Sequence, residues 1–255
     1  MTATEILALY DAEMRANPAP EPGICHERSA GVLCAVGFYN CILYSRLGAA
    51  DADAAIADQV AYFAARGVDV EWKVYGHDLP PDLSRRLSKA GFVADESETL
   101  MAFDLAHALT AGASPAGVKI RRVADASALA DFGAIVAATF NDTAIATIER
   151  YGPRLTDPSL GLYVAYTDGR PVAAARLEMC ADRPFAGLWG GMTLPAYRRR
   201  GIFRALVGTR ADEARRRGYR FLNVDARETS RPILVRLGFM ALTSVTGWIL
   251  KASRS

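Results

Sequence analysis

Hydrophobic positions in the first half of the chain predict helices that alternate with short strands. Residues 3–15 mix Ile, Leu and Ala with acidic side chains, a pattern typical of an amphipathic helix. A second helix is expected over 51–66, because Asp51 can cap its start and Gly67 can end it. The other elements expected here are strands over 32–47, 70–75 and 92–103 and a helix over 81–89 that stops at Gly91.

From residue 118 onward the alternation of strand and helix patterns is more regular. Apolar residues recur at helical spacing in 125–140, and a further helix is expected over 143–151. Asp168 and Gly169 form a turn sequence between two strand patterns, which predicts a β-hairpin. The other elements expected here are strands over 118–123, 162–166, 172–179, 188–193, 221–225 and 239–250 and helices over 202–216 and 231–237. Consecutive strands followed by alternating helices and strands predict an α/β (α+β) fold, with a central mixed β-sheet flanked by helices.

Residues 109–117 have the composition of a linker, since Pro115 and Gly117 stand among other small and polar residues. The linker divides the chain into an expected N-terminal domain, 1–108, and an expected C-terminal domain, 118–255. Each part is long enough to form its own hydrophobic core.

The sequence also contains one short internal repeat. Residues 87–92 and 234–239 both end a helix pattern with Gly and Phe before a strand pattern. A duplicated fold would explain the repeat. Chance would explain it as well, because glycine after a helix is common. The sequence leaves both explanations open.

Composition places the chain among globular proteins. Of its 255 residues, 51% are hydrophobic and 23% are charged, a balance that excludes a disordered or fibrous chain. The longest run without a charged residue, 29–45, is shorter than the roughly 20 apolar residues of a membrane helix, so no membrane partner is expected. The four cysteines show no CxxC spacing and are expected to be free thiols of a cytoplasmic protein.

Positive charge is concentrated in one segment, although the net charge of the whole chain is only +2. Residues 195–227 contain ten arginines against three acidic residues. Arg198, Arg199 and Arg200 directly precede a helix pattern, whose N-terminus already carries a partial positive charge. They cost stability there unless an anion binds, and Gly201 allows a phosphate to approach the first amides closely. The pattern favours a phosphate site over a solvated arginine cluster. A nucleic-acid surface is disfavoured, because no aromatic residues are interleaved to stack on bases.

Two glycines, Gly190 and Gly191, interrupt the strand that precedes this turn. Glycines inside a strand commonly mark a β-bulge or a place where a ligand or a second backbone comes close. Pro195 then ends the strand, because it cannot donate a hydrogen bond to a neighbouring strand. A bulged strand, an arginine turn and a helix start therefore follow each other within a few residues.

This segment resembles the acetyl-CoA-binding motif of the GCN5-related N-acetyltransferase (GNAT) family, in which Gln or Arg is followed by two residues, Gly, one residue, and Gly or Ala. Arg198 and Gly201 match the first two motif positions. The helix end and Gly-Phe pair at 236–239 match the family's late helix and last strand. The resemblance covers about 118–250 and implies the acyl-CoA N-acyltransferase (GNAT) fold. Through the repeat at 87–92, it also suggests a degenerate, non-catalytic N-terminal copy.

The resemblance implies acetyl-CoA as the acyl donor and a primary amine that attacks it directly in a ternary complex. Strand main chain would pair with the pantetheine arm, and the turn amides would hold the pyrophosphate. An amide near Met192 would polarise the thioester carbonyl. The implied acetyl-CoA-binding residues are Met192, Thr193, Leu194, Arg198, Arg199, Arg200, Gly201, Ile202, Phe203 and Arg204. No metal and no nucleic-acid partner are implied, and the sequence contains no HExxH, GKS or GKT, GxGxxG or nucleophile-elbow motif.

Two positions depart from the family pattern. Phe203 stands where Gly or Ala is usual, so its ring must point into the core. Leu234 stands where the family often has a tyrosine that protonates the leaving thiolate. Glu178 and Asp225 are the candidate general bases. The alternative to an N-acetyltransferase is a non-catalytic module that binds CoA or acyl-CoA as a regulatory ligand, which Leu234 would suit.

Overall fold

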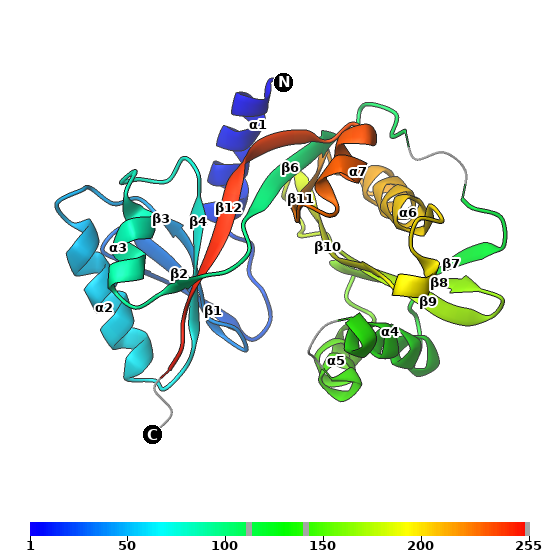
Figure 1. Ribbon diagram of the computed structural model, residues 1–255, viewed down its shortest axis with the longest axis horizontal. Helices are drawn as coiled ribbons and strands as arrows, with labels where there is room; N and C mark the ends of the chain where they lie inside the picture. Colours follow the sequence, from blue (N-terminus) through cyan, green and yellow to red (C-terminus); the bar gives the residue numbers. More distant parts are fainter. Residues whose placement is uncertain (111–113, 140–142, 253–255) are drawn as a thin grey trace. The chain divides into compact units, whose positions relative to one another are not determined.

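The chain divides into two units in this computed structural model, which describes residues 1–110, 114–139 and 143–252 (Figure 1). Unit 1 consists of Met1–Met101, Asp225–Arg231 and Ala241–Ser255. Unit 2 consists of Ala102–Val224 and Pro232–Met240. The C-terminal part of the chain therefore contributes residues to both units.

Unit 1 is built on a sheet that changes from antiparallel to parallel pairing. Its elements are α1 (Ala3–Tyr10), the π-helix η1 (Asp11–Arg15), β1 (Ile24–Ser29), β2 (Val32–Gly37), β3 (Cys41–Ser45), α2 (Ala52–Ala64), β4 (Val70–Tyr75), α3 (Leu83–Lys89), β5 (Val93–Ala94), most of β6 (Glu98–Asp104) and most of β12 (Met240–Leu250). Strands β1 to β3 pair antiparallel in chain order, and β4 lies parallel to β3. Helix α2 makes the crossover that a parallel pair requires.

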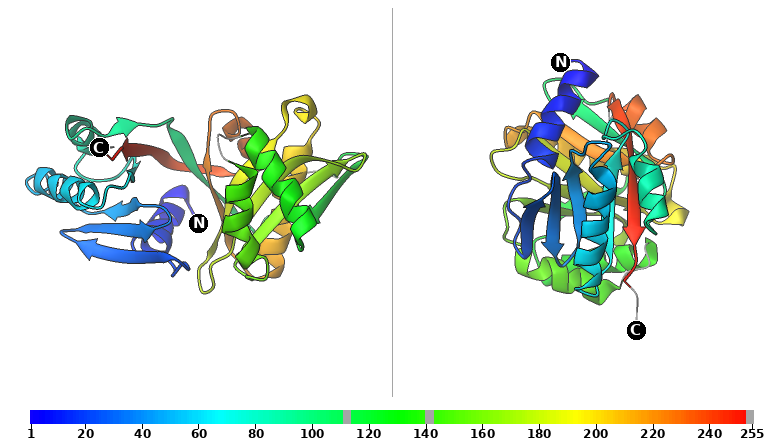
Figure 2. Two further views of the ribbon diagram at one scale, coloured as in Figure 1. Left: turned by 90° about the horizontal axis from the view of Figure 1, so that it is seen from below. Right: turned by 90° about the vertical axis from the view of Figure 1, so that its left-hand side faces the viewer.

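Helices α2 and α3 cover one face of this sheet (Figure 2, right). Phe63 of α2, Trp72 of β4 and Leu87 of α3 meet there, each with 0% of its side chain exposed. Helix α1 lies on the opposite side, where the rings of Tyr10 and Tyr75 are 6.4 Å apart between centroids. Alternation along β4 explains both contacts, because successive strand residues face opposite sides of a sheet.

Unit 2 repeats the same type of sheet with longer strands. Its elements are β7 (Val118–Arg122), α4 (Ala126–Thr139), α5 (Ala144–Tyr151), the 3₁₀ helix η2 (Gly152–Arg154), β8 (Leu160–Thr167), β9 (Arg170–Glu178), β10 (Phe185–Thr193), the 3₁₀ helix η3 (Pro195–Tyr197), α6 (Ile202–Arg216), most of β11 (Phe221–Ala226) and most of α7 (Arg231–Arg236). Strands β7 to β10 are antiparallel in chain order, and β11 lies parallel to β10. Helices α4 and α5 cover one face of the sheet and α6 the other (Figure 1).

The two halves of the chain share one order of elements. In the first half, three antiparallel strands are followed by α2, a parallel strand, α3 and the pair Gly91–Phe92. In the second half, β8 to β10 are followed by α6, a parallel strand, α7 and the pair Gly238–Phe239. The shared topology favours duplication over chance as the origin of the sequence repeat.

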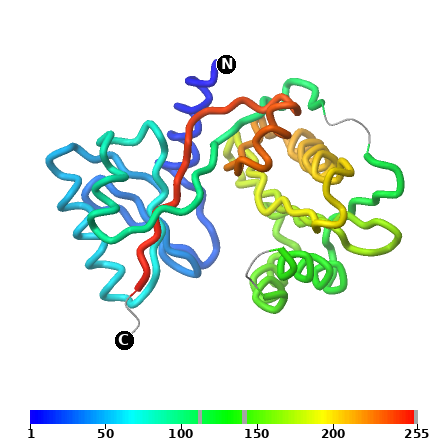
Figure 3. The backbone as a smooth tube through the Cα atoms, in the orientation of Figure 1, coloured from blue at the N-terminus to red at the C-terminus, as the bar shows by residue number. Residues whose placement is uncertain are grey.

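The long strand that follows each Gly-Phe pair, β6 or β12, has residues in both units. Strand β6 begins in unit 1, but its last residues belong to unit 2, where the ring of Phe103 lies 5.3 Å from that of Phe239. Strand β12 begins at the end of unit 2, and its residues from Ala241 onward belong to unit 1, where they pair antiparallel with β4 (Figure 3). The expected division at 109–117 differs from these units, because it placed β12 in the C-terminal domain.

The structure confirms the mixed sheet flanked by helices, and most expected elements lie within a few residues of their predicted bounds. Strand β1 was not predicted, since its sequence, ICHERS, contains too few apolar residues to show strand alternation. The strand expected over 92–103 is divided into β5 and β6. Residues 111–113 of the expected linker and the expected end of a helix at residue 140 lie outside the described residues.

A buried ion pair in unit 1 joins β4 to the end of β11. The Lys73 ammonium donates to Oδ2 of Asp225, whose side chain is 1% exposed. Burial alone would lower the pKa of Lys73, but the Asp225 carboxylate, with Tyr75 and Tyr10, raises it well above its usual value. Lys73 therefore stays protonated inside unit 1, where it pairs with Asp225.

Replacing Lys73 by methionine should destabilise the protein by about 3–5 kcal/mol, because Asp225 would remain buried without its counter-charge. At roughly 2–4 °C per kcal/mol, the melting temperature should fall by roughly 6–20 °C. The matched control is Lys251→Met, since the ion pair of Lys251 with Asp69 is largely exposed and worth about 0–1 kcal/mol. The double variant Lys73→Met with Asp225→Leu should recover most of the loss in a calorimetric scan. An equal loss in both single variants would contradict this account.

Candidate functional site

The parallel strands β10 and β11 pair only at their beginnings. Their register runs from Phe185 with Phe221 to Gly187 with Asn223, which is three residue pairs. Beyond Gly187, β10 continues to Thr193, and within the described residues it pairs there with β9 alone, on its other edge. The edge of β10 that faces β11 is therefore open from Leu188 onward. A strand edge of this kind offers main-chain donors and acceptors to an extended ligand.

A β-bulge lies in the middle of the open stretch. The register between β10 and β9 shifts between Trp189 and Met192, so Gly190 and Gly191 together face one residue of β9. Gly190 has φ +53°, a left-handed conformation that a residue with a side chain rarely adopts. The two glycines thus mark a bulge, as expected from the sequence.

The turn after β10 leads directly into α6, and the first backbone amides of α6 have no partner within the helix. Arg198 is extended, whereas Arg199 and Gly201 have positive φ values of 61° and 80°. Gly201 is the N-cap of α6 and supplies no side chain to the first turn. The amides of Ile202 and the two following residues have no partner inside the helix, as at any helix N-terminus. Such a start binds anions through its amides and its dipole.

Gly201 cannot be replaced by a larger residue without disturbing this turn. A Cβ atom there would lie 3.2 Å from Cγ of Pro115 and 3.4 Å from Nη2 of Arg204. Its positive φ adds a backbone cost of about 1–2 kcal/mol for any L-residue with a side chain. The backbone conformation of the turn therefore favours glycine, and a side chain there would also press against Pro115 and Arg204.

Only some of the clustered arginines are available to a ligand. Arg210 is 1% exposed. Arg215 and Arg217 donate hydrogen bonds to main-chain carbonyls of neighbouring segments. The segment's full excess of positive charge is therefore not displayed on the surface. Four exposed arginines remain around the start of α6: Arg198, Arg199, Arg200 and Arg204. This local charge is what recognition of a phosphate requires.

Two of the exposed arginines are held by neighbours in the turn. Nε of Arg198 donates to the carbonyl of Thr193 at 3.1 Å. The guanidinium of Arg200 lies over the ring of Tyr197, 5.1 Å from its centroid. The turn is thus partly organised around its own side chains, which reduces the ordering cost of binding.

Phe203 fits into the site because Gly191 leaves room for it. A Cβ atom at Gly191 would lie 3.0 Å from Cε2 of the Phe203 ring, so the half-buried ring lies against the bulge. The ring is half-buried against the bulge rather than enclosed in the core, and α6 begins at Ile202. The departure from the family pattern at Phe203 is therefore compensated by a glycine on the facing strand.

The implied strand residues lie at the end of β10 as expected. Met192 is 5% exposed and packs in the core of unit 2 together with residues of α4. Thr193 pairs with Ala173 of β9, and the amide of Leu194 donates to the carbonyl of Val172 at 2.9 Å. Pairing to β9 fixes this end of β10, and its other edge stays open.

The two candidate bases lie in different surroundings. Glu178 is the last residue of β9 and pairs in register with Gly187, the residue at which β10 and β11 separate. Its carboxylate is 35% exposed and forms an ion pair with Arg176, with 3.0 Å between Oε1 and Nε. Asp225 is instead buried in unit 1 against Lys73. Leu234 of α7 is 1% exposed and packs in a core.

In the sequence, Arg210 stood out only as one of the ten arginines of residues 195–227. Its side chain lies on the buried face of α6, three and four residues from Val207, Leu206 and Ala214. An arginine at an apolar position of an amphipathic helix was the available signal. Its contacts are described below.

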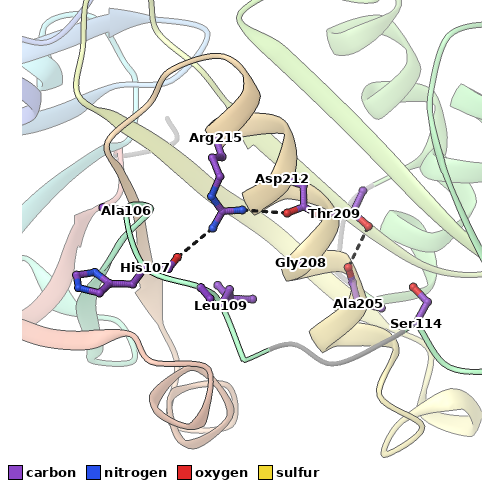
Figure 4. Close-up of a pocket in the computed structure, with 10 residues that line it drawn as sticks. Ala106, His107, Leu109, Ser114, Ala205, Gly208, Thr209, Asp212 and Arg215 are labelled. Carbon is purple, nitrogen blue, oxygen red and sulfur yellow. Dashed lines mark hydrogen bonds and ion pairs between the residues drawn. The ribbon is translucent and has the colours of Figure 1, made fainter.

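A cavity of about 670 Å³ lies along a different part of α6 (Figure 4). Arg215 spans one side of it, donating to the carbonyls of Leu105 and His107, each at 3.1 Å, and pairing with Asp212 at 3.0 Å. The lining residues are Ala106, His107, Ala108, Leu109, Ser114, Ala205, Gly208, Thr209, Asp212 and Arg215. None of the implied acetyl-CoA-binding residues lines this cavity.

Two classes of feature are absent from the described parts of the chain. In residues 1–110, 114–139 and 143–252, no group of His, Cys, Asp or Glu side chains is arranged to hold a metal ion. Over the same residues, no helix is both long and apolar enough to cross a bilayer.

In this mixed sheet, a parallel strand pair opens beyond three residue pairs and leads into an arginine turn at a helix start. Residues 128–239 match the model of the Acetyltransferase (GNAT) family. The family resemblance of the second half is thereby confirmed. No curated protein matches the sequence.

Solved structures confirm the fold over nearly the whole chain. A GCN5-related N-acetyltransferase from Kribbella flavida is similar with a TM-score of 0.73 and 18% identity, over 96% of this chain and 94% of that one. A tandem GNAT protein from the clavulanic acid biosynthesis pathway has a TM-score of 0.66 and 13% identity, over 93% and 86%. A GCN5-related N-acetyltransferase from Sphaerobacter thermophilus has a TM-score of 0.67 and 16% identity, over 87% and 77%. Both units thus belong to a known architecture.

Proposed function

We propose that this protein is an acetyl-CoA-dependent N-acetyltransferase whose active site lies in unit 2. The observation that carries the proposal is the open edge of β10 leading directly into the arginine turn and the uncapped start of α6. The equivalent helix of unit 1, α2, starts instead at Asp51 with Asp53 in its first turn. Carboxylates at a helix start repel a phosphate, so the donor site is assigned to unit 2 alone.

Acetyl-CoA fits this site by the chemistry of its two ends. The amides from Arg199 to Arg204 would hold the pyrophosphate, assisted by the exposed guanidinium groups of the turn. The main chain from Met192 to Leu194 would pair with the amides of the pantetheine arm, as an added strand pairs with a sheet edge. Bound acetyl-CoA supplies the activated acetyl group, and the protein supplies its position.

Transfer of the acetyl group then requires an amine held close to the thioester, with little covalent participation by the protein. The amine nitrogen attacks the thioester carbon, the C–S bond breaks, and CoA leaves as a thiol after the proton lost by the amine reaches the sulfur. An amide near Met192 donates to the carbonyl oxygen as negative charge develops on it. Holding both reactants in one complex supplies much of the rate, because two molecules then react as one.

We assign the general base to Glu178 rather than Asp225. Glu178 is partly exposed, and its strand position adjoins the point where β10 and β11 separate. Asp225 is buried, and its charge is taken up by Lys73. A base must reach the proton it removes, and an exposed carboxylate beside the open strand can do so.

The experiment is a transfer assay with acetyl-CoA and a panel of primary amines, in which free CoA thiol is followed with a thiol-reactive dye. We expect amine-dependent thiol release that exceeds hydrolysis without amine. Glu178→Gln should lower kcat by about 10²–10⁴-fold, the usual contribution of a general base, and should leave the affinity for acetyl-CoA unchanged.

The buried Leu234 favours one second candidate, a module that binds acyl-CoA without transfer. No side chain at that position can protonate the thiolate. Such a module would bind CoA in calorimetry and release no thiol with any amine. Binding without turnover would therefore replace the proposed enzyme by the regulatory module, and absence of binding would overturn both.

A further inference from the structure

Arg210 is a fully buried arginine without an acidic partner. It is 1% exposed, and none of the described carboxylates forms an ion pair with it. Burial lowers its pKa to about 10, so it stays protonated at neutral pH. A buried charge without a counter-charge is costly and persists only where hydrogen bonds satisfy it. Its contacts therefore indicate what the charge is used for.

The guanidinium of Arg210 binds main-chain carbonyls at the bulge of β10. Nη1 donates to the carbonyl of Arg176 in β9 at 2.9 Å and to that of Trp189 in β10 at 3.5 Å. These two residues form the last regular pair before the bulge. Nε donates to the carbonyl of Leu206 in α6 at 3.0 Å. One side chain thus joins two strands and a helix at the point where the ladder is interrupted.

The same side chain lies close to the glycine that accommodates Phe203. A Cβ atom at Gly191 would be 3.7 Å from Nη2 of Arg210 and 3.0 Å from the Phe203 ring. Phe203 is in the first turn of α6, whose amides form the phosphate end of the proposed site. Arg210 and Phe203 therefore both fix α6 against the bulged segment of β10.

We propose that Arg210 is a positioning residue that holds the open edge of β10 in register with the start of α6, so that one acetyl-CoA molecule can engage both. The inference rests on the proposed function. Arg210 touches neither the phosphates nor the reacting atoms. It acts through the carbonyls of the bulge and through the helix whose N-terminus faces the phosphates.

The proposal predicts a selective loss of binding. A ligand with only the phosphate end, 3′-phosphoadenosine 5′-diphosphate, uses α6 alone, whereas CoA also uses β10. In Arg210→Met, the affinity for the fragment should change by less than about threefold, and the affinity for CoA should fall by about tenfold or more, because the pre-organised arrangement of the two parts is lost. Both affinities are measured by titration calorimetry, with the fold verified by circular dichroism.

Three further variants make the outcome decisive. Arg210→Lys keeps the charge but not the fork of donors, and its CoA affinity should fall between wild type and Arg210→Met. Gly191→Ala disturbs the same junction from the strand side and should give the same selective loss, which serves if Arg210→Met does not fold. Arg216→Met, at an exposed position of α6, should change neither affinity.

The affinities for CoA and for the fragment distinguish failure of the positioning role from failure of the proposed function. If wild type binds both ligands and the ratio of their affinities is unchanged in folded Arg210 and Gly191 variants, the positioning role is refuted and the proposed function stands. If wild type binds neither CoA nor the fragment, the proposed function itself fails. A general loss of stability would not change the ratio.

Discussion

Replacing Gly201 by valine should abolish the rise in melting temperature that acetyl-CoA causes in the wild type. The variant forces a β-branched residue into a backbone with φ +80° and places a Cβ atom 3.2 Å from Pro115. The turn must then shift, and the amides at the start of α6 no longer converge on one anion. A ligand at 100 times its Kd stabilises by about 2.7 kcal/mol, or roughly 5–10 °C in a protein of this size. We expect that whole increment to disappear in a thermal-shift measurement.

Gly169→Val is the matched control for Gly201→Val. Gly169 also has a positive φ, +76°, but it lies in the turn between β8 and β9, and an added Cβ atom there would have no neighbour within 4 Å. Its replacement should lower the melting temperature through the same backbone strain and keep the increment due to acetyl-CoA. If both variants keep that increment, the turn at Gly201 is not the phosphate site.

Replacing Val245 by aspartate should unfold unit 1 selectively. Val245 is 2% exposed and pairs with Tyr75, so β12 completes the sheet of unit 1 beside β4. A carboxylate buried there without a partner costs several kcal/mol, comparable with the whole stability of a domain. Hydrogen exchange measured by mass spectrometry should show β4 losing its protection, and β9 in unit 2 keeping most of its own.

The control for this variant is Ala241→Asp, which adds the same charge at an exposed position of β12. It should leave exchange in β4 close to that of the wild type. Equal loss of protection in β4 and β9 after Val245→Asp would contradict the assignment of β12 to unit 1. The comparison thus tests the exchange of strands between the two halves of the chain.

Local signals in the sequence were sufficient for most elements and for the arginine turn on which the proposed donor site rests. The periodicity of residues 202–216 predicted α6 within its observed bounds, since an amphipathic stripe and a glycine stop are properties of the segment itself. The arginine turn was recognisable because cations before a helix are unfavourable without an anion. The bulge followed from two adjacent glycines in a strand pattern.

Local sequence signals did not predict the contacts between distant segments. The carboxylate of Asp225 qualified as a base in the sequence, but the fold pairs it with Lys73, 152 residues away. Arg210 was counted among the clustered arginines of residues 195–227, but the packing of α6 on β10 buries it against carbonyls. Strand β12 follows unit 2 in the sequence, and it nevertheless completes the sheet of unit 1.

The sequence by itself determined the order of helices and strands, the arginine turn at the start of α6 and the glycine bulge of β10, because each depends on residues close together in the chain. Only the tertiary structure decided which strand completes which sheet, where β10 and β11 separate, and which charges are neutralised or buried. These outcomes depend on which distant surfaces pack together, and an ion pair, a strand pairing or a buried arginine is stable only when that packing excludes water around it.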